Sequence, residues 1–510
     1  MPRFTRRNLG LLGLVLLIAG VHGWSLLRYP EVFVDEAWFA SRAWGFLQTG
    51  RAFGALDHGV FERFDGYWTF LPWLGTWIQS WGLRWSATPS LLGVRIVSLV
   101  FGFVLLAQTY FIGSRLISRT VGLVALGLLA GSYPFFLSAH WARYDIFTAV
   151  FGYGGVVLFL LNRRERLWLD ALAGLCVGLA VEIHAFGAIF VPCVAALYVL
   201  RYRQHILKQP RFWSFIAGGV VALLIYLGLH VVRYPTAFVQ LNALQFGPTH
   251  TPPLLAGSPR VLWESLRDLV GLYGTSLLAL APLFVVAIIW ALRRRTPALI
   301  VLLSLNGVLF SATLLLIRAK QAYYGIFLAP AALLLVAAWM VVVVGRLRLS
   351  RSVRTMYREV VVILAVANTL LMLQALRPNQ WAEYRFAHAA IKPFVPASST
   401  IMAAQTYWFD FANQPYYSWE QLIFYRRYKP VSTLAEAFAV YKPDIFILDG
   451  HIRGFIVDQP RTDGSYSQAL ELSRPELNAI LAERATLVTS FDVPRGDTSV
   501  DHVEVYRFEW

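Results

Sequence analysis

The stretch "NLGLLGLVLLIAGVHGWSLLRYPEVFVDEAWFA", residues 8–40, joins a long apolar run to two adjacent carboxylates, Asp35 and Glu36. A helix needs about 20 apolar residues to cross a hydrocarbon core of about 30 Å, and residues 8–27 provide them. The acidic pair therefore follows directly after a predicted membrane span. Charged side chains at membrane depth are costly unless they face a cavity or a partner, so this pair is the first candidate for a functional site.

The composition of the whole chain is strongly hydrophobic as well. Of its 510 residues, 57% are hydrophobic and 15% are charged, and the mean hydropathy is +0.55. This leaves too little polar surface for a soluble globular protein. The sequence predicts a polytopic α-helical membrane protein with about 11 transmembrane helices, near residues 8–27, 89–113, 121–138, 145–162, 167–184, 185–200, 212–232, 269–291, 297–317, 321–344 and 359–376.

Basic residues orient these spans, because short cytoplasmic loops retain Lys and Arg. When spans are counted alternately, one side receives all the basic clusters, which lie at 3–7, 115–119, 163–166, 201–211, 293–295 and 346–358. The N-terminus is then cytoplasmic. The net charge of +16 reflects this topology, so we expect no nucleic-acid partner. The first run also has the pattern of a cleaved signal sequence, but we expect it to be retained as the anchor of Asp35.

Three segments are predicted on the outer side: 28–88, 233–268 and the tail from 377. In the tail, "STIMAAQ", "PDIFILDG" and "VEVYRFEW" are typical of strands, and "STLAEAFAVYK" is typical of an amphipathic helix. We therefore predict a membrane module over 1–376, which includes loop 28–88, and an outer-face α/β domain over 377–510. The chain has two cysteines, both in predicted spans, which gives no disulfide framework.

Several other ionisable residues lie near the predicted outer ends of spans. They are Arg143 and Asp145 in "SAHWARYDIF", Glu182 and His184 in "AVEIHAFG", and Arg318 and Lys320 in "LIRAKQAYYG". Several have an ordinary structural explanation: a helix cap for Asp145, an interfacial anchor for the Arg and Lys residues and a hydrogen-bonded buried side chain for His184. For the acidic pair the corresponding explanations are a helix cap for Asp35 and a first-turn acid for Glu36. Their gathering on one side favours a shared function. Asp35 and Glu36 project about 100° apart on a helix, so we expect them to contact different groups.

Three motifs carry a resemblance to a known family: "FVDEAWFA" (33–40), "WARYDIFTAVF" (141–151) and "KQAYYGIFLAPAALLL" (320–335). The chain resembles GT-C glycosyltransferases of the family 39 type, the group of protein O-mannosyltransferases and bacterial aminoarabinose transferases. The resemblance implies an inverting enzyme that moves a sugar from a polyprenyl-phosphate donor to a hydroxyl of a lipid, glycan or protein acceptor. It also implies a bacterial inner-membrane protein with its active site and tail domain on the extracytoplasmic side.

The resemblance also suggests roles for the candidate residues. In the family the Asp of the Asp-Glu pair is the general base, which here is Asp35, and we group Glu36 and Asp145 with it. A leaving phosphate needs positive charge and hydrogen-bond donors, for which the candidates are Arg143, Lys320, Arg318, Tyr323 and Tyr324. The candidates for the cavity or the acceptor site are Arg63, His58, His184 and Glu182.

A divalent metal is a candidate ligand of the loop between the first two predicted spans. Some relatives bind one, and loop "DHGVFERFDGYW" supplies His58, Glu62 and Asp65 as candidate ligands. Their spacing matches no recognised metal motif, so a solvated loop face is the alternative. We predict no certain cofactor and keep a divalent metal as a candidate.

Two departures from the family pattern limit the comparison. The segment "EIHAFG" (182–187) stands where many relatives carry another motif, and the tail does not repeat the soluble module of protein mannosyltransferases. A transporter or flippase for lipid-linked sugars and a non-catalytic binding subunit are the alternative functions. A transporter is expected to show repeated halves and charges near the bilayer midplane. Here we find no repeat and the charges gather at one boundary, which favours an enzyme.

Overall fold

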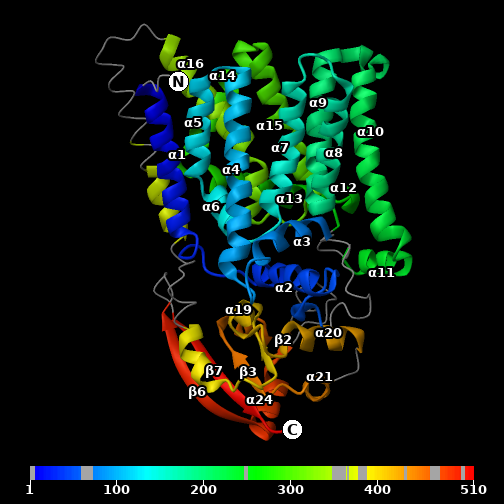
Figure 1. The fold of residues 1–510 in the computed structure, drawn as a ribbon, viewed down its shortest axis with the longest axis vertical. Coiled ribbons are helices and arrows are strands. Elements are labelled where there is room, and N and C mark those ends of the chain that lie inside the picture. The colour runs from blue at the N-terminus through cyan, green and yellow to red at the C-terminus, as the bar shows by residue number, and fades with distance from the viewer. Residues whose placement is uncertain are drawn as a thin grey trace.

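The computed structural model describes residues 6–58, 73–245, 251–346, 363, 367–376, 387–429, 433–459, 471–494 and 500–510. Figure 1 shows a bundle of long helices stacked on a smaller sheet domain formed by the tail, with α2 (Val34–Thr49) and α3 (Trp73–Ser80) lying across the boundary between them. The acidic pair Asp35 and Glu36, which belongs to α2, therefore lies at this boundary.

The long helices of the bundle run roughly parallel to one another (Figure 1). They are α1 (Arg6–Ser25), α4 (Leu91–Leu116), α5 (Arg119–Ala130), α7 (Asp145–Leu161), α8 (Leu167–Ile183), α9 (Phe190–Tyr202), α10 (Pro210–Tyr226), α13 (Pro259–Leu277), α14 (Ala281–Arg294), α15 (Pro297–Leu316) and α16 (Ala329–Arg346). The short helix α6 (Tyr133–His140) follows α5 after a sharp bend. Shorter helices α11 (Pro235–Gln245) and α12 (Pro253–Ala256) lie in the predicted outer segment 233–268.

The bundle is built from helices that are apolar enough for a bilayer. Within the described residues, five helical stretches are long and apolar enough to cross a membrane, or six if one bent pair counts as a single span. The shorter apolar helices are Val15–Ser25, Asp145–Leu161, Ala329–Val343 and Ala367–Leu376. The predicted class of a polytopic α-helical membrane protein is confirmed, whereas the number of 11 spans stays a prediction.

The bent pair is the predicted span 121–138, which the structure breaks in two. Helices α5 and α6 meet at an angle of 67° around Gly131 and Ser132. Ser132 is the N-terminal cap residue of α6 and Pro134 lies in its first turn, a position that proline favours because its missing N–H would have no partner there. The break carries the chain from α6 into the short connection that holds Arg143.

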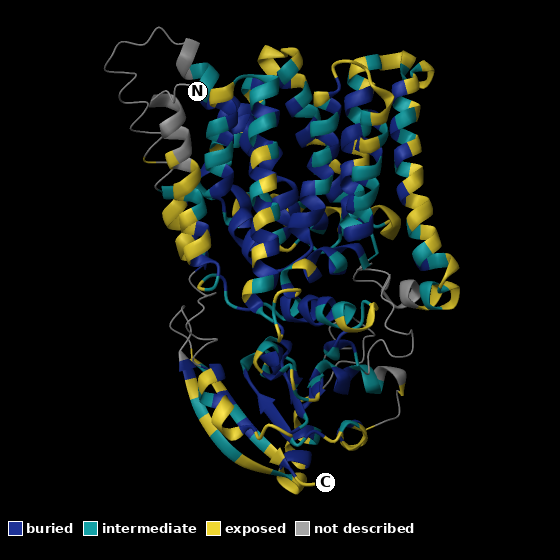
Figure 2. Ribbon diagram, in the orientation of Figure 1, coloured by how far each residue is buried: buried dark blue, intermediate teal, exposed yellow. Residues whose placement is uncertain are grey.

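Close contacts hold α10, at the edge of the bundle in Figure 1, against α8. A Cβ added to Gly174 of α8 would lie 1.9 Å from the Phe215 carbonyl oxygen, and one added to Gly218 of α10 would lie 1.8 Å from the Ala171 carbonyl oxygen. Glycine at both positions lets the two backbones touch. Figure 2 shows buried residues concentrated inside the bundle and at the boundary, and exposed residues on the outer faces of several helices.

The tail folds into a five-stranded mixed sheet of order β2-β1-β3-β7-β6. Strands β1 (Ile401–Ala403), β2 (Tyr416–Ser418) and β3 (Ile445–Leu448) are parallel, and β7 (Val500–Phe508) pairs antiparallel with β3 and with β6 (Ala485–Pro494). A two-stranded sheet joins β4 (Ile456–Val457) to β5 (Leu472–Ser473). The helices are α19 (Trp408–Phe411), α20 (Glu420–Tyr428), α21 (Leu434–Tyr441), α22 (Gly450–Arg453) and α24 (Arg474–Arg484).

Candidate active site

The acidic pair lies in the first turn of α2. Phe33 is the N-terminal cap residue, and its backbone N–H donates to Glu36 Oε2 at 3.3 Å. Successive helical residues project about 100° apart, and the two carboxylates have different surroundings. The Asp35 side chain is 35% exposed, whereas that of Glu36 is completely buried. Asp35 is therefore the member of the pair that a substrate can reach.

Glu36 is held by a buried arginine from α4. Arg95 Nε donates to Glu36 Oε1 and Arg95 Nη2 donates to Oε2, both at 2.8 Å, and both side chains are completely buried. The Ala142 backbone N–H donates to Glu36 Oε1 at 2.9 Å. Both carboxylate oxygens thus have partners, so the geometry favours a positioning role for Glu36 over the catalytic role suggested with Asp35.

Arg95 also fixes the chain that leads into α2. Its guanidinium donates to three backbone carbonyl oxygens between α1 and α2, those of Leu26 at 2.8 Å, Pro30 at 3.0 Å and Glu31 at 3.3 Å. The sequence reasoning missed Arg95, although a lone arginine inside the apolar stretch 89–113 was an available signal. It connects the start of α2 to the α6–α7 connection through Glu36.

Arg143 lies in that connection and meets two carboxylates. Its Nη1 donates to Asp35 Oδ2, and its Nε donates to Asp145 Oδ2 at 2.8 Å. The guanidinium lies over the Tyr323 ring, 3.8 Å from the ring centroid, and the side chain is 3% exposed. Burial opposes its charge, but Asp145, Tyr323 and Asp35 hold the pKa of Arg143 well above its ordinary value. The structure thus brings four predicted site residues together.

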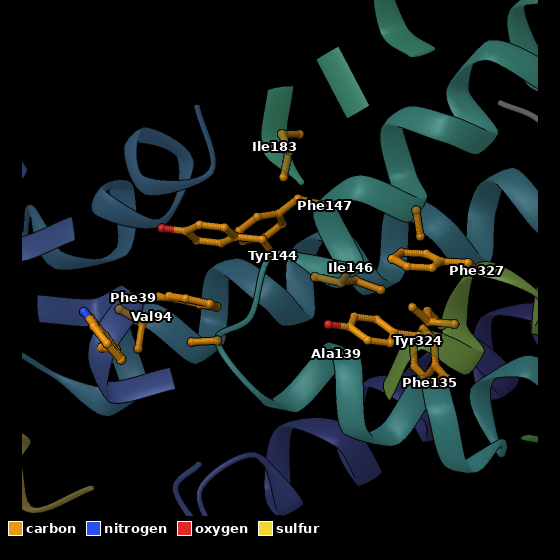
Figure 3. Close-up of a cluster of buried hydrophobic side chains, with 14 of the residues drawn as sticks. Phe39, Val94, Phe135, Ala139, Tyr144, Ile146, Phe147, Ile183, Tyr324 and Phe327 are labelled. Atoms are coloured by element: carbon orange, nitrogen blue, oxygen red, sulfur yellow. The ribbon is translucent and has the colours of Figure 1, made fainter. Parts of the chain in front are cut away.

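Tyr144 explains why Arg143 and Asp145 stay at this place. Figure 3 shows its ring in a cluster of buried apolar side chains that includes Phe39 and Phe147. The ring stacks on Phe39 with centroids 4.4 Å apart, and the hydroxyl hydrogen-bonds the Thr76 hydroxyl at 2.7 Å. Because the backbone is anchored at Tyr144, its two charged neighbours are fixed beside Asp35.

Asp145 has one oxygen that the protein does not use. The side chain is completely buried, and its Oδ1 has no hydrogen-bond partner among the described residues. Buried polar atoms are nearly always hydrogen-bonded. Asp145 Oδ1 therefore keeps the capacity to accept one more hydrogen bond beside Arg143.

Aromatic and imidazole side chains lie next to Arg143. The rings of Tyr323 and Tyr324 lie 4.5 Å apart, and the ring of His184 lies 6.1 Å from that of Tyr324. Both tyrosines belong to the short helical segment Ala322–Phe327 that precedes α16. His184 Nδ1 accepts from the Phe186 backbone N–H at 3.1 Å. The ring can then offer an Nε2–H to a neighbour.

The remaining predicted residues have their main contacts elsewhere. Lys320 Nζ donates to Ser265 Oγ at 2.5 Å and to the Ile317 carbonyl at 2.6 Å, and Arg318 Nη2 lies 3.5 Å from Glu264 Oε2. Burial lowers the pKa of Lys320 to about 8. These contacts direct both cations to the start of α13.

Glu182 and the loop residues lie apart as well. Glu182 Oε1 pairs with His230 Nε2 at 2.8 Å, beside a cavity of about 490 Å³ between α8 and α10. His58 packs its ring against Phe53, and the predicted residues Glu62, Arg63 and Asp65 lie outside the described residues. Within the described part of the chain, no three or more His, Cys, Asp or Glu side chains are placed to hold a metal ion.

The tail domain reaches Asp35 from the other side. Glu420, the first residue of α20, is close enough for the Asp35 charge to affect it. Burial, with a smaller contribution from Asp35, raises the pKa of Glu420 to about 7. The sequence reasoning did not single out Glu420, because nothing local distinguishes it from an ordinary first-turn acid.

Comparison with known proteins identifies the fold. No protein-family model matches the chain, and no curated protein matches it. ArnT from Cupriavidus metallidurans, in a crystal structure bound to undecaprenyl phosphate, matches with a TM-score of 0.61 and 13% identity over 97% of this chain and 98% of that chain.

An archaeal structure matches as well. The Archaeoglobus fulgidus oligosaccharyltransferase AglB, in complex with an inhibitory peptide and a dolichol-phosphate, has a TM-score of 0.52 and 13% identity over 93% of this chain and 70% of that chain. The same oligosaccharyltransferase in complex with Zn and sulfate has a TM-score of 0.54 and 14% identity. The chain therefore has the GT-C fold of membrane glycosyltransferases. The narrower assignment to the family 39 type stays a prediction.

Proposed function

We propose that the protein is an inverting glycosyltransferase that moves a sugar from a polyprenyl-phosphate donor to a hydroxyl of a cell-envelope acceptor. The observation that carries the proposal is the contact of Arg143 with both Asp35 and Asp145, with Asp35 as the partly exposed carboxylate. The similar structures support the donor class, because that of ArnT holds undecaprenyl phosphate and that of AglB holds a dolichol-phosphate.

In the proposed reaction Asp35 is the general base. The acceptor hydroxyl is not ionised at neutral pH, so a positioned carboxylate has to take its proton during attack. The hydroxyl oxygen forms a bond to the sugar C1 while the bond from C1 to the phosphate oxygen breaks. Attack from the face opposite the phosphate inverts C1, and the lipid phosphate leaves with the electron pair of the broken bond.

Arg143 stabilises the leaving phosphate in this proposal. Its guanidinium is suited to bidentate contact with phosphate oxygens, and Tyr323 and Tyr324 provide hydroxyl groups nearby. Arg143 carries one positive charge against two carboxylates. An incoming phosphate therefore competes with Asp35 for Arg143, and its arrival would free Asp35 for the acceptor hydroxyl.

We further propose the domain division 1–376 and 377–510 and a location in the bacterial inner membrane with the site on the extracytoplasmic side. Which sugar is moved and whether the acceptor is a lipid, a glycan or a protein are matters for the assay below. A divalent metal would need ligands beyond those that the described residues bring together, and no step of the proposed reaction uses one.

The test is sugar transfer from a panel of polyprenyl-phosphate sugars to cell-envelope extracts. Asp35→Asn is expected to reduce transfer by about 10²–10⁴-fold, the range typical of a lost general base. Asp268→Asn is the matched control, because Asp268 is an exposed residue of α13 paired with its neighbour Arg267. Equal turnover of wild type and Asp35→Asn would remove Asp35 from the mechanism. Movement of the lipid-linked sugar across the membrane without transfer would favour the transporter alternative.

A further inference from the structure

A cavity of about 500 Å³ lies between the bundle and the tail domain. Its bundle wall includes Glu31, Phe33 and Val34, which precede or begin α2, and Trp141 of the α6–α7 connection. Val34 is followed directly by Asp35. The cavity therefore lies beside the residue proposed as the general base, and both parts of the chain are needed to form it.

The tail wall of the cavity is polar and acidic. It includes Tyr407, Asp449, His451 and Asp501. Asp449 Oδ1 accepts from the Ile452 backbone N–H at 3.0 Å, and Tyr407 also bonds to the Asp449 carboxyl group. Burial raises the pKa of Asp449, and the charge of Asp501 acts in the same direction. Both carboxyl groups line the same cavity wall, where Asp501 packs against Gly450, the residue that follows Asp449.

A glycine brings these two carboxyl groups near each other. Gly450 lines the cavity, and a Cβ added there would lie 2.3 Å from Asp501 Oδ1. Any larger residue would push Asp501 away from the Asp449 side of the cavity. The absence of a side chain at position 450 is thus a condition for the acidic pair.

Aromatic rings provide the other half of the lining. Phe33 and Trp141 stack with centroids 4.7 Å apart on the bundle side, and Tyr407 and Phe455 line the tail side. Carboxyl groups that bond to hydroxyls, next to aromatic faces that cover the apolar side of a ring, suit a carbohydrate. The described residues of the lining include no Lys or Arg, so the cavity disfavours an anionic group.

We propose that this cavity binds the sugar end of the acceptor, and that the acceptor is a hydroxyl-rich glycan without anionic groups. The proposal rests on the glycosyltransferase function and adds to it the class of the acceptor. A glycan held between Asp449, Asp501 and Glu31 presents a hydroxyl to Asp35. That hydroxyl loses its proton to Asp35 as its oxygen bonds to the donor C1 and the lipid phosphate leaves.

The first experiment measures binding to the purified full-length protein in lipid nanodiscs. The probes are cellobiose, a glucosamine disaccharide and digalacturonate. Binding of each probe is measured by saturation-transfer NMR. Cellobiose and the glucosamine disaccharide are expected to bind, and digalacturonate is not. Asp501→Asn and Glu31→Gln, which alter opposite walls, are each expected to weaken binding by about tenfold or more, as for hydrogen bonds to a charged group. Asp492→Asn is the matched control, because this β6 carboxylate is 68% exposed.

The second experiment separates this proposal from the proposed function. With a donor that wild type accepts, Asp501→Asn and Glu31→Gln are expected to raise the acceptor KM by a larger factor than they lower kcat. Asp35→Asn is expected to lower kcat. Normal sugar binding by a wild type that transfers nothing would support the cavity as a glycan site and overturn the glycosyltransferase function.

Three results would overturn the cavity proposal. The first is that wild type binds no sugar. The second is that both cavity variants bind sugar as strongly as wild type, once their wild-type unfolding temperatures have shown that they are folded. The third is preferential binding of a Ser/Thr peptide probe, which would identify a protein acceptor. If one variant fails to fold, the other decides, because Glu31 and Asp501 lie on different parts of the chain.

Discussion

At the scale of single residues, neighbouring carboxylates have different environments. Glu36 is completely buried against Arg95, whereas the Asp35 side chain remains 35% exposed. The difference follows from helix geometry, since adjacent residues face different directions. One carboxylate holds the start of α2 in place, and its neighbour is presented to the site with Arg143 beside it.

The buried pair gives a prediction about stability. Arg95→Gln leaves the Glu36 carboxylate buried without its charged partner, and breaking such a pair typically costs about 3–5 kcal/mol. We expect the free energy of unfolding to fall by about this amount, measured by denaturation in mixed micelles. The matched control is Glu165→Gln, which breaks an exposed pair with Arg201 and is expected to cost about 1 kcal/mol or less. Equal effects of the two variants would contradict the structural role of Arg95.

Part of the candidate site was predictable from local sequence. Asp35, Arg143 and Asp145 were predictable because charge near a predicted span is informative, and Tyr323 was proposed as a hydrogen-bond donor to the phosphate. The structure brings these four residues together. Arg318 and Lys320 have the same local signature but contact α13 instead. Whether a cation near a span end faces the site depends on contacts between distant segments, which local sequence does not encode.

At the scale of elements, α20 places a carboxyl group of the tail domain near Asp35. The pKa of Glu420 is raised to about 7 from an ordinary value of 4.5. The folded protein then holds a proton that the unfolded chain releases at lower pH. The stabilisation is complete below pH about 4.5 and is lost as pH rises through about 7.

Thermal unfolding of the tail domain should show this dependence. We expect the unfolding temperature of wild type to fall between pH 5 and pH 8, and Glu420→Gln to flatten the curve and to be the more stable protein at pH 8. Glu483→Gln, which changes a 70% exposed residue of α24, should keep the wild-type dependence. Parallel curves for wild type and Glu420→Gln would show that Glu420 does not titrate in this range.

Some elements of the fold were predictable and others were not. The expected strands of the tail correspond to β1, β3 and β7, and the expected helix corresponds to α21, which has a capping box between Thr433 and Glu436. The strands β2 and β6 were missed. The bend between α5 and α6 was also missed, because Gly131 and Ser132 lie inside an otherwise continuous apolar run.

At the scale of the whole molecule, the bundle and the tail domain meet at the candidate site. Helix α2 lies between them in Figure 1, and the 500 Å³ cavity has walls from both. The positive-inside pattern predicts that the tail is outside the cell membrane and that the loop around Arg163 is inside.

Cysteine labelling tests this orientation. Asp458→Cys, at a position that is 82% exposed in the tail domain, should react in intact spheroplasts with a maleimide that cannot cross the membrane. Arg163→Cys, exposed in the loop between α7 and α8, should react only after the membrane is permeabilised. The unaltered protein measures the background from Cys176 and Cys193. The reverse pattern would place the site on the cytoplasmic side.

The unpaired oxygen of Asp145 has a consequence for the choice of sugar. Oδ1 is buried and accepts no hydrogen bond from the described residues, so a donor hydroxyl that reaches it would add a hydrogen bond. A deoxy analogue without that hydroxyl would leave the oxygen unsatisfied, and sites of this kind discriminate strongly. We expect one deoxy position of the accepted donor to lower kcat/KM by about 10–100-fold in wild type, and to have a much smaller effect in Asp145→Asn. The identity of the transferred sugar would then depend on a single buried atom.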